Sequence, residues 1–359
     1  MVSKLEKISS PTFVVLKKAV EANIHHFKQK AQFNNLTLRP HFKTHQNNTI
    51  AKQFYDLGIR NIAVSNIAMA EEFSHFQWDN ISLAFPFNIR EIDKLNKISE
   101  NTQITILVES IETLDFLNQN LINTIGVYIK IDAGYNRTGI SYKNTAMVQQ
   151  LINKIEESDK LILKGLLSHF GNTYSAKSKE EVISIYSISI SLIEQLRQGL
   201  DQAYNNIPIS VGDTPSVSIV DDFGNVDELR PGNFVYYDWM QYKIGSCELN
   251  QIAAVMICPI VAKHNDRLQI IIHGGAVHFS KEGYSENNEI RYGQAVNMDN
   301  DLSLSLIADT FIKSISQEHG IVQCTEDSFG KFEIGDLMVF IPIHSCLTAN
   351  LMKLDIEFV

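Results

Sequence analysis

Cysteine is scarce in this sequence of 359 residues, and the cysteines that it has lie far apart. No two of them show the CxxC spacing of a zinc finger, and their wide separation also argues against a disulfide framework. Any cysteine with a function is therefore expected to act singly. The four are Cys247, Cys258, Cys324 and Cys346.

Long apolar runs are also missing. Nowhere do about 18 apolar residues follow one another, the length that a membrane-spanning helix needs. The first ten residues, MVSKLEKISS, carry charges, but no apolar segment or small-residue cleavage site follows them. We therefore expect a soluble, cytoplasmic protein.

Basic residues are too few to balance the acidic ones, and the formal net charge is −10. This deficit argues against a nucleic acid or an anionic membrane as the partner. The 44% hydrophobic content can fill more than one ordinary core of roughly 100–200 residues. A small-molecule enzyme with two domains, or with one barrel and an appendage, is expected.

A repeated unit fills the first part of the chain: a short apolar or β-branched run, a polar turn, and a longer stretch with helical periodicity. Together these units predict a TIM (β/α)8 barrel over residues 15–244. The eight predicted strands are residues 37–43, 61–66, 81–86, 103–110, 126–132, 161–170, 208–213 and 225–235.

One segment of this region, residues 180–196, is ambiguous because Ile and Ser alternate in it as they would in a strand. It is too long for an ordinary strand, however. Ile185, Ile188, Leu192 and Leu196 would share one face of a helix, so we predict a helix.

After residue 244 the pattern changes to strand-like runs without intervening helices, at 251–265, 267–277 and 336–347. We predict a β-rich second domain over residues 245–359. Residues 1–14, which lead into the β-prone PTFVVL (11–16), are assigned to the same domain.

Polar residues gather where the predicted barrel strands end. Active sites of TIM barrels lie at the carboxyl ends of the strands, so these residues are expected to form one surface that can hold an anionic aromatic cofactor. They are Lys43 after the first strand, Asp132 to Arg137 after the fifth, His169 after the sixth, Gly212 and Thr214 after the seventh, and Arg230 and Gly232 at the eighth.

Two neighbouring strand ends offer a phosphate site. GDTPS (212–216) supplies a glycine, a hydroxyl and a helix start, whose N–H groups attract phosphate. RPGN (230–233) follows on the next strand, and barrels commonly bind phosphate in the loops after strands seven and eight. Alone, each segment is more typical of a plain turn; the pair favours phosphate.

The stretch RPHFKTHQ (39–46) concentrates basic residues in an acidic chain. His41 and Lys43 are two apart on a predicted strand and would point the same way. If they point into the barrel mouth, neighbouring cations and partial burial would lower the pKa of Lys43 and favour the free amine that forms Schiff bases. The alternative is a solvated surface charge.

A second chemical motif is IPIHSCL (341–347), in which His344 and Cys346 are two apart on a strand-like run. Imidazole and thiolate together suit zinc. Two protein ligands are too few for a closed structural site and suit an open catalytic one. The alternative is an ordinary buried pair.

Taken together, these motifs make the sequence resemble the fold-type III pyridoxal-phosphate enzymes, in particular the group that contains D-serine dehydratase and D-threonine aldolase. The resemblance spans nearly the whole chain. It rests on RPHFKTH (39–45), DAGYNRTG (132–139), SHFGNTY (168–174), GDTPS (212–216), RPGNFVYYD (230–238) and IPIHSCLTANL (341–351).

The resemblance implies a role for each candidate residue. Lys43 would be joined to the aldehyde of pyridoxal 5′-phosphate, and His344 and Cys346 would bind a divalent metal, zinc. Related enzymes are dimers, so a homodimer is expected. The remaining cofactor-binding residues would be Arg137 near the ring oxygen, His169 and Arg230 along the pyridine ring, Tyr174 near ring or substrate, and Gly212, Thr214, Gly232 and Asn233 around the phosphate.

The activity that the resemblance implies is a metal-dependent lyase reaction on D-3-hydroxy amino acids. Cys346 favours dehydration of D-serine or 3-hydroxy-D-aspartate to a 2-oxo acid and ammonia, whereas Asp at this position is more aldolase-like. Cleavage to glycine and an aldehyde is the first alternative. An amino-acid racemase, which would need a second base, and a non-catalytic cofactor carrier are the others. His273 and His278 are either ordinary residues or part of an unusual substrate pocket.

Overall fold

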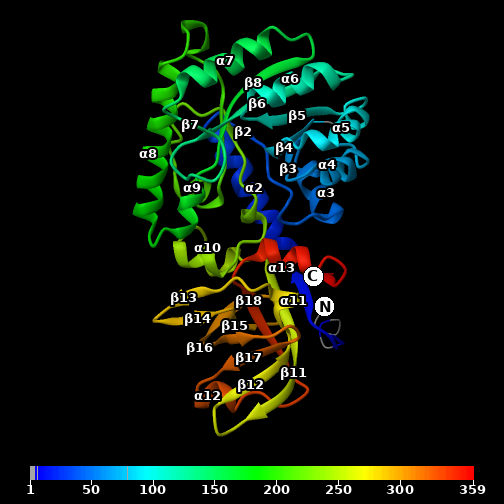
Figure 1. The fold of residues 1–359 in the computed structure, drawn as a ribbon. Helices are drawn as coiled ribbons and strands as arrows, with labels where there is room; N and C mark the ends of the chain where they lie inside the picture. The colour runs from blue at the N-terminus through cyan, green and yellow to red at the C-terminus, as the bar shows by residue number, and fades with distance from the viewer. Residues whose placement is uncertain (1–4, 6, 79) are drawn as a thin grey trace. The chain divides into compact units, whose positions relative to one another are not determined.

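The computed structural model describes residues 5, 7–78 and 80–359 (Figure 1). The chain forms two compact units. One comprises His25–Gly232, and the other comprises Met1–Ile24 together with Asn233–Val359.

The first unit is a parallel barrel, as the sequence predicts. Each of the eight predicted runs overlaps one of its strands. In spatial order they are β2 (Thr37–Leu38), β10 (Glu228–Leu229), β9 (Ile209–Val211), β8 (Leu161–Ser168), β6 (Ile125–Asp132), β5 (Gln103–Val108), β4 (Asn80–Pro86) and β3 (Asn61–Val64), with the short β7 (Ile140–Ser141) beside β6.

A single bridge closes the barrel between its first and last strands. His41, beyond the end of β2, pairs in parallel with Ala63 of β3. The Phe42 amide donates to the Ala63 carbonyl at 2.8 Å, and the Ala63 amide donates to the Pro40 carbonyl at 3.0 Å. The barrel therefore closes immediately before Lys43.

Helices follow the strands, and most begin at a side-chain cap of the predicted kind. Asn47, Asn66, Ser110, Asn144 and Ser178 each accept a hydrogen bond from a backbone amide of the first turn. The helices are α2 (Lys17–Phe33), α3 (Asn48–Asp56), α4 (Ile67–Ser74), α5 (Ile92–Ile98), α6 (Ile111–Asn120), α7 (Thr145–Glu156), α8 (Lys179–Gln198) and α9 (Thr214–Ile219).

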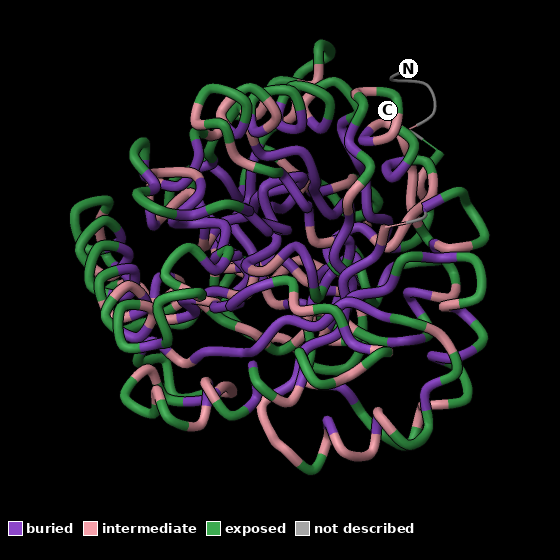
Figure 2. Tube along the Cα trace, turned by 90° about the horizontal axis from the view of Figure 1, so that it is seen from above, coloured by how far each residue is buried: buried purple, intermediate pink, exposed green. Residues whose placement is uncertain are grey.

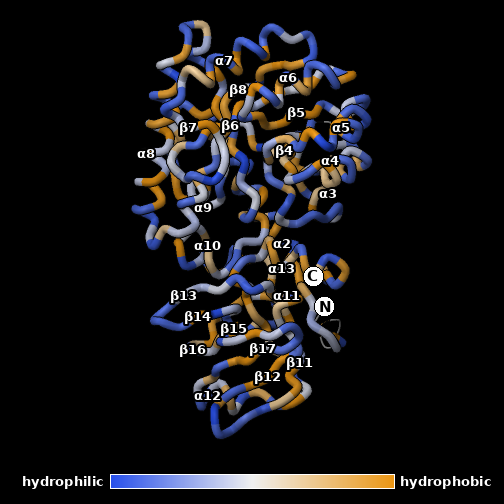
Figure 3. Tube along the Cα trace, in the orientation of Figure 1, coloured by the Kyte–Doolittle hydropathy of each residue, from blue (hydrophilic) through white to orange (hydrophobic). Residues whose placement is uncertain are grey.

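Buried residues follow the barrel strands, whereas the helices carry exposed outer faces (Figure 2). β5 and β6 are buried along almost their whole length, and both are largely hydrophobic in Figure 3. Continuous apolar strands of this kind are typical of parallel sheets that helices cover.

The ambiguous segment 180–196 is a helix, as predicted, and its predicted buried face is right at Leu196 but wrong at Ile188. Ile188 is 58% exposed. The buried face instead runs through Val182, Tyr186, Ser189 and Ile193. Tyr186 donates to the Phe223 carbonyl at 2.9 Å, so an aromatic ring and a small serine pack inward while several isoleucines face outward.

The second unit is built on a mainly antiparallel sheet, in which only β1 and β19 of the described strands pair in parallel, and this confirms the predicted β-rich C-terminal region. The strand predicted at 11–16 is β1, which pairs with β11 and β19 of this sheet. In order the sheet contains β12 (Gln269–His273), β17 (His319–Gln323), β16 (Leu304–Ile315), β15 (Gly293–Met298), β18 (Leu337–Pro342), β11 (Ala254–His264), β1 (Thr12–Val15) and β19 (Ile356–Phe358).

Smaller elements complete the second unit. A separate hairpin is formed by β13 (Tyr284–Glu286) and β14 (Glu289–Arg291). The α-helices are α10 (Trp239–Ile244), α11 (Ala276–Phe279), α12 (Glu326–Phe329) and α13 (Ser345–Leu351). Across the described residues of both units, none of the helices has the length and hydropathy that crossing a membrane requires.

Candidate active site

Lys43 lies in a turn just past the point where the barrel closes. The predicted strand through residue 43 is wrong, because regular pairing ends at His41 and residues 42–45 turn. The Lys43 amide donates to Nδ1 of His41 at 3.3 Å. Lys43 is exposed, so the partial burial expected for it is not found.

Phe42 anchors this turn in an aromatic cluster. Its ring lies 5.0 Å from that of Phe73, 5.0 Å from that of Trp78 and 4.4 Å from that of His45, measured between centroids. Burial lowers the pKa of His45 to about 3, so this imidazole is a neutral core residue. The buried residues on both sides of Lys43 fix the backbone that carries the exposed amine.

Basic residues predicted on separate strand ends converge. Burial lowers the pKa of His41 well below its ordinary value, and Lys43, Arg230 and His169 lower it further. Burial likewise lowers the pKa of His169, and Arg137 is the largest charge that lowers it further. Around two neutral imidazoles, those of His41 and His169, the structure therefore gathers the charges of Lys43, Arg137 and Arg230.

His169 is held in one tautomer. Its Nδ1 is hydrogen-bonded to the carbonyl oxygen of Gly212. A carbonyl can only accept, so Nδ1 carries the proton and the neutral ring keeps a lone pair on Nε2. The ring lies 6.2 Å from that of Tyr174, a second residue predicted near the cofactor.

Arg230 is buried and held by a polar chain that crosses the barrel interior. Its Nε donates to Oγ of Ser210 at 2.7 Å, and Ser210 donates to Oε1 of Glu228 at 2.6 Å. Oε2 of Glu228 accepts from Nε of Arg39 at 2.7 Å. Ser210, Glu228 and Arg39 were not among the predicted site residues, because their pairing joins positions far apart in the sequence.

Lys130 of β6 was also missed. Its side chain is buried, and burial together with Arg230 and Arg137 lowers its pKa to about 7. At neutral pH a large fraction of this amine is therefore uncharged. Lys130 therefore supplies a second lysine amine, besides that of Lys43, near the predicted cofactor-binding residues Arg137 and Arg230.

Asp213 is the N-cap of α9. Oδ2 of Asp213 accepts from the Ser216 amide at 2.8 Å and from the Thr173 hydroxyl at 2.8 Å. Burial raises the pKa of Asp213 to about 6. The Thr214 amide donates to the Tyr174 hydroxyl at 3.1 Å, which joins the predicted tyrosine to the predicted phosphate loop.

The two predicted phosphate glycines stand where backbones approach closely. A Cβ on Gly212 would lie 2.6 Å from the Arg230 carbonyl oxygen. A Cβ on Gly232 would lie 3.0 Å from the His41 carbonyl oxygen and 3.1 Å from Oγ1 of Thr44. These glycines allow β9, β10 and the Lys43 turn to pack against one another.

The loop that carries Arg137 is shaped by Asp132. Oδ1 of Asp132 accepts from the amides of Gly134 and Asn136, both at 3.0 Å. Arg137 is exposed, with its guanidinium carbon 5.2 Å from the centre of the Tyr135 ring.

The predicted metal ligands belong to the second unit. The strand predicted through them is wrong: β18 ends at Pro342, and His344 is the N-cap of α13. Burial lowers the pKa of His344, but hydrogen bonds with Cys346 and Glu282 outweigh it and hold the pKa well above its ordinary value. The helix turn therefore still brings the imidazole and the thiol together.

Two further residues adjoin this pair. Oε2 of Glu282 lies 3.3 Å from Nδ1 of His344. Nδ2 of Asn233 lies 3.5 Å from Sγ of Cys346 and donates to Oδ2 of Asp238 at 2.6 Å. The Asn233 side chain is therefore engaged beside Cys346, so a phosphate contact from this residue would use its backbone.

The comparisons with known proteins identify the family. The family model of the alanine racemase N-terminal domain matches residues 15–238. The chain belongs to this family. A second model, that of a serine dehydratase domain, matches residues 253–355. The resemblance to fold-type III enzymes is confirmed.

Three relatives illustrate the likeness. The chain is 26% identical to D-serine dehydratase of Dictyostelium discoideum, over 97% of this chain and 93% of the relative. It is 22% identical to D-threo-3-hydroxyaspartate dehydratase of Delftia sp. (strain HT23), again over 97% and 93%. It is also 22% identical to 3-hydroxy-D-aspartate aldolase of Paracoccus denitrificans (strain Pd 1222), over 96% and 87%.

The Delftia enzyme also has a solved structure, which matches at a TM-score of 0.86 and 21% identity over 97% of this chain and 93% of that one. This match shows that the fold is shared along nearly the whole chain.

Proposed function

We propose that this protein is a lyase of D-3-hydroxy amino acids that depends on pyridoxal 5′-phosphate and a divalent metal, and that it dehydrates its substrate to a 2-oxo acid and ammonia. The observation that carries the proposal is the convergence of Lys43, Arg137, His169 and Arg230 at one end of the barrel. The relatives named above support this class of reaction.

The residues present fit the cofactor. A phosphate-bearing aldehyde needs an amine, cationic groups and hydrogen-bond donors, and the barrel supplies all three in an otherwise acidic chain. Lys43 would hold the aldehyde, Arg137 the ring oxygen, and Gly212, Thr214, Gly232 and Asn233 the phosphate. When bound, the cofactor supplies an electron sink for the pair left at Cα.

His169 and Arg230 would lie along the pyridine ring, as the resemblance implies, with Tyr174 beside them. The carbonyl of Gly212 orients His169, and Ser210 orients Arg230. Both contacts are made by the folded chain itself, so these side chains are positioned before any ligand binds.

Proton transfer falls to Lys43. The amine is exposed on a turn that Phe42 anchors, which leaves it accessible while its backbone is fixed. We assign it the removal of the Cα proton as general base.

The metal site would be formed by His344 and Cys346. Nitrogen and sulfur donors suit zinc, and a two-residue site leaves positions open for water or substrate. The metal would polarise the substrate β-hydroxyl there. A solved structure of a variant D-threo-3-hydroxyaspartate dehydratase is that of the metal-free form, which supports a metal in that enzyme.

Dehydration is preferred to aldol cleavage because Cys346 stands where aldolase-like sequences have Asp. A cytoplasmic location, predicted from the sequence, and a homodimer, which rests on the resemblance alone, complete the proposal.

The test is an incubation of the full chain, with cofactor and zinc, against both enantiomers of serine, threonine and threo-3-hydroxyaspartate. A 2-oxo acid formed only from D substrates, lost on chelation and restored by zinc, is the expected result. Glycine with an aldehyde would move the assignment to an aldolase, and scrambled handedness would move it to a racemase. Bound cofactor without any turnover would leave the non-catalytic cofactor carrier as the assignment.

A further inference from the structure

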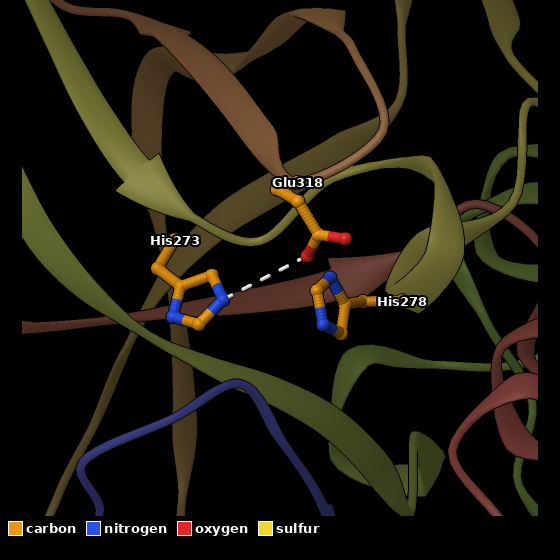
Figure 4. A group of neighbouring side chains, drawn as sticks. All are labelled: His273, His278 and Glu318. Atoms are coloured by element: carbon orange, nitrogen blue, oxygen red, sulfur yellow. Dashed lines mark ion pairs between the residues drawn. The ribbon is translucent and has the colours of Figure 1, made fainter.

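Three metal-ligating side chains lie together in the second unit (Figure 4). His273 is the last residue of β12, His278 belongs to α11, and Glu318 lies in the turn between β16 and β17. One ligand atom from each lies within 4.8 Å of those of the other two. No other such trio of His, Cys, Asp or Glu occurs in the part of the chain that the structure describes.

The geometry is already close to that of a coordination sphere. Nε2 of His273 is 3.9 Å from Oε2 of Glu318, and the rings of His273 and His278 are 5.6 Å apart. Ligands of a tetrahedral zinc ion are separated by about 3.3 Å, given bond lengths near 2.0–2.1 Å. The three atoms lie within 4.8 Å of one another, so side-chain rotation would have to bring them closer to reach that spacing.

The backbone that carries the three residues is fixed. The Gly274 amide donates to the Glu318 carbonyl at 2.9 Å, and the Ala276 amide donates to the Ser316 carbonyl at 2.7 Å. A Cβ on Gly275 would lie 2.5 Å from the Ser316 carbonyl oxygen. The pair of glycines therefore lets the segment before α11 pack directly on the β16–β17 turn, which holds the ligands in place.

The local charges favour a cation. Burial lowers the pKa of His278, so the ring is neutral at neutral pH and has a lone pair to give. The carboxylates of Glu318 and Asp355 act on His278 in the opposite direction. A metal ion would meet the neutral ring of His278 together with the negative charge of Glu318 and Asp355.

We propose that His273, His278 and Glu318 form a second metal site, for a divalent transition-metal ion of the zinc class, with water as the remaining ligand. Two nitrogens and one carboxylate oxygen are the donors that such ions take in open sites. This site is independent of His344 and Cys346 and of the proposed reaction. An ion bound at this site would hold the segment before α11 against the β16–β17 turn.

Coordination has a visible consequence at Gly275. Its amide donates to Nδ1 of His278 at 3.1 Å. A metal on Nδ1 takes the same lone pair, and a metal on Nε2 of a neutral ring moves the proton to Nδ1. Either way the hydrogen bond is lost, so the Gly275 amide reports on the site.

The test is a titration of the metal-stripped full chain with cobalt(II) and zinc(II), with bound metal counted after desalting. The wild type is compared with His278→Gln, Glu318→Gln and the matched control His319→Gln. His319 of β17 pairs with His273 of β12, but it is not one of the three proposed ligands. All four proteins keep His344 and Cys346.

The expected result is that the wild type and His319→Gln bind one ion more than His278→Gln and Glu318→Gln do. Glu318 is exposed, so its substitution tests the site even if His278→Gln fails to fold. In Cys346→Ala, cobalt should bind without a sulfur charge-transfer band, and added zinc should shift the Gly275 amide resonance. Equal metal content in all four proteins, or a Gly275 resonance that zinc leaves unmoved, would overturn the proposal.

Discussion

Ser210 accepts a hydrogen bond from Nε of the buried Arg230 at 2.7 Å. The same hydroxyl donates to Glu228 at 2.6 Å, so one small side chain joins a cation to a carboxylate inside the barrel. A buried guanidinium needs such partners, because an unpaired buried charge is costly. Ser210 and Glu228 therefore fix the position of the Arg230 side chain inside the barrel.

Replacing Ser210 tests this positioning. Ser210→Ala removes the acceptor of Arg230 Nε, and we expect the dissociation constant for pyridoxal 5′-phosphate to rise about tenfold, since a hydrogen bond to a charged group contributes roughly 1.5–3 kcal/mol. Ser210→Thr, which keeps the hydroxyl, should restore most of the affinity. Absorbance titration of the apo protein measures both.

The control for Ser210→Ala is Ser82→Ala. Ser82 is equally buried, and its hydroxyl has no hydrogen-bond partner among the described residues. An affinity that falls as much in Ser82→Ala as in Ser210→Ala would show that the effect is a loss of packing.

Asp213 gives the fold a pH dependence. Its pKa is raised to about 6 from an ordinary 3.8, so the folded state holds this proton more tightly than the unfolded state does. The protonated carboxyl of Asp213 therefore stabilises the folded state below about pH 4, and this stabilisation is lost as the pH rises through 6. The total loss in the free energy of unfolding is on the order of 2–3 kcal/mol. Asp213→Asn keeps an acceptor for the α9 cap and should lack this loss.

The measurement is the free energy of unfolding of the cofactor-free protein between pH 4 and pH 7.5. The advantage of Asp213→Asn over the wild type should grow as the pH rises, whereas Asp213→Ala, which removes the cap, should be less stable than Asp213→Asn at every pH. Parallel curves for wild type and Asp213→Asn would refute the assignment.

Gly212 is required by packing. In Gly212→Ala the new Cβ would lie 2.6 Å from the Arg230 carbonyl oxygen, so β9 and β10 must move apart. We expect the free energy of unfolding to fall by about 1–3 kcal/mol, as for other overpacked sites. Gly330→Ala is the control, because its nearest neighbour would be 3.5 Å away. Denaturant titration compares the two, and equal stability would contradict the close approach.

Cys346 is expected to decide metal binding and product. Cys346→Ala should lower zinc-dependent formation of 2-oxo acid by about 100-fold, a loss of roughly 2.7 kcal/mol. Cys346→Asp should keep the metal but form glycine at the expense of the 2-oxo acid. Cys258→Ala, a buried cysteine of the sheet, is the control. An unchanged 2-oxo acid yield in Cys346→Ala would remove this residue from the site.

The barrel could be predicted because each strand has a local sequence signal, which is an apolar run between turn residues. The first strand was drawn too long because RPHFK looks extended in sequence, whereas its pairing ends at the His41–Ala63 bridge. Ile188 was predicted to face inward because isoleucine is apolar, but in the structure Tyr186 and Ser189 of the same helix are buried instead. Which face of a helix is buried and where a strand stops pairing depend on the neighbouring elements, and hydrophobic periodicity carries no information about those neighbours.

The site followed a similar division. Lys43, His169 and Arg230 could be proposed as site residues from the sequence because strand ends and motifs mark them. Glu228 and Lys130 could not be interpreted alone, because a charged residue in a strand gains its meaning from partners distant in sequence. Arg39, which pairs with Glu228, is 189 residues away along the chain.

The central claim is that Lys43 carries the cofactor, and the most direct test is to identify the modified lysine. The full chain is loaded with pyridoxal 5′-phosphate, the lysine–cofactor bond is reduced with borohydride, and the digest is mapped by mass spectrometry. The account predicts the label on Lys43 and its loss in Lys43→Arg. Label on Lys130, the buried amine whose pKa is about 7, would contradict it.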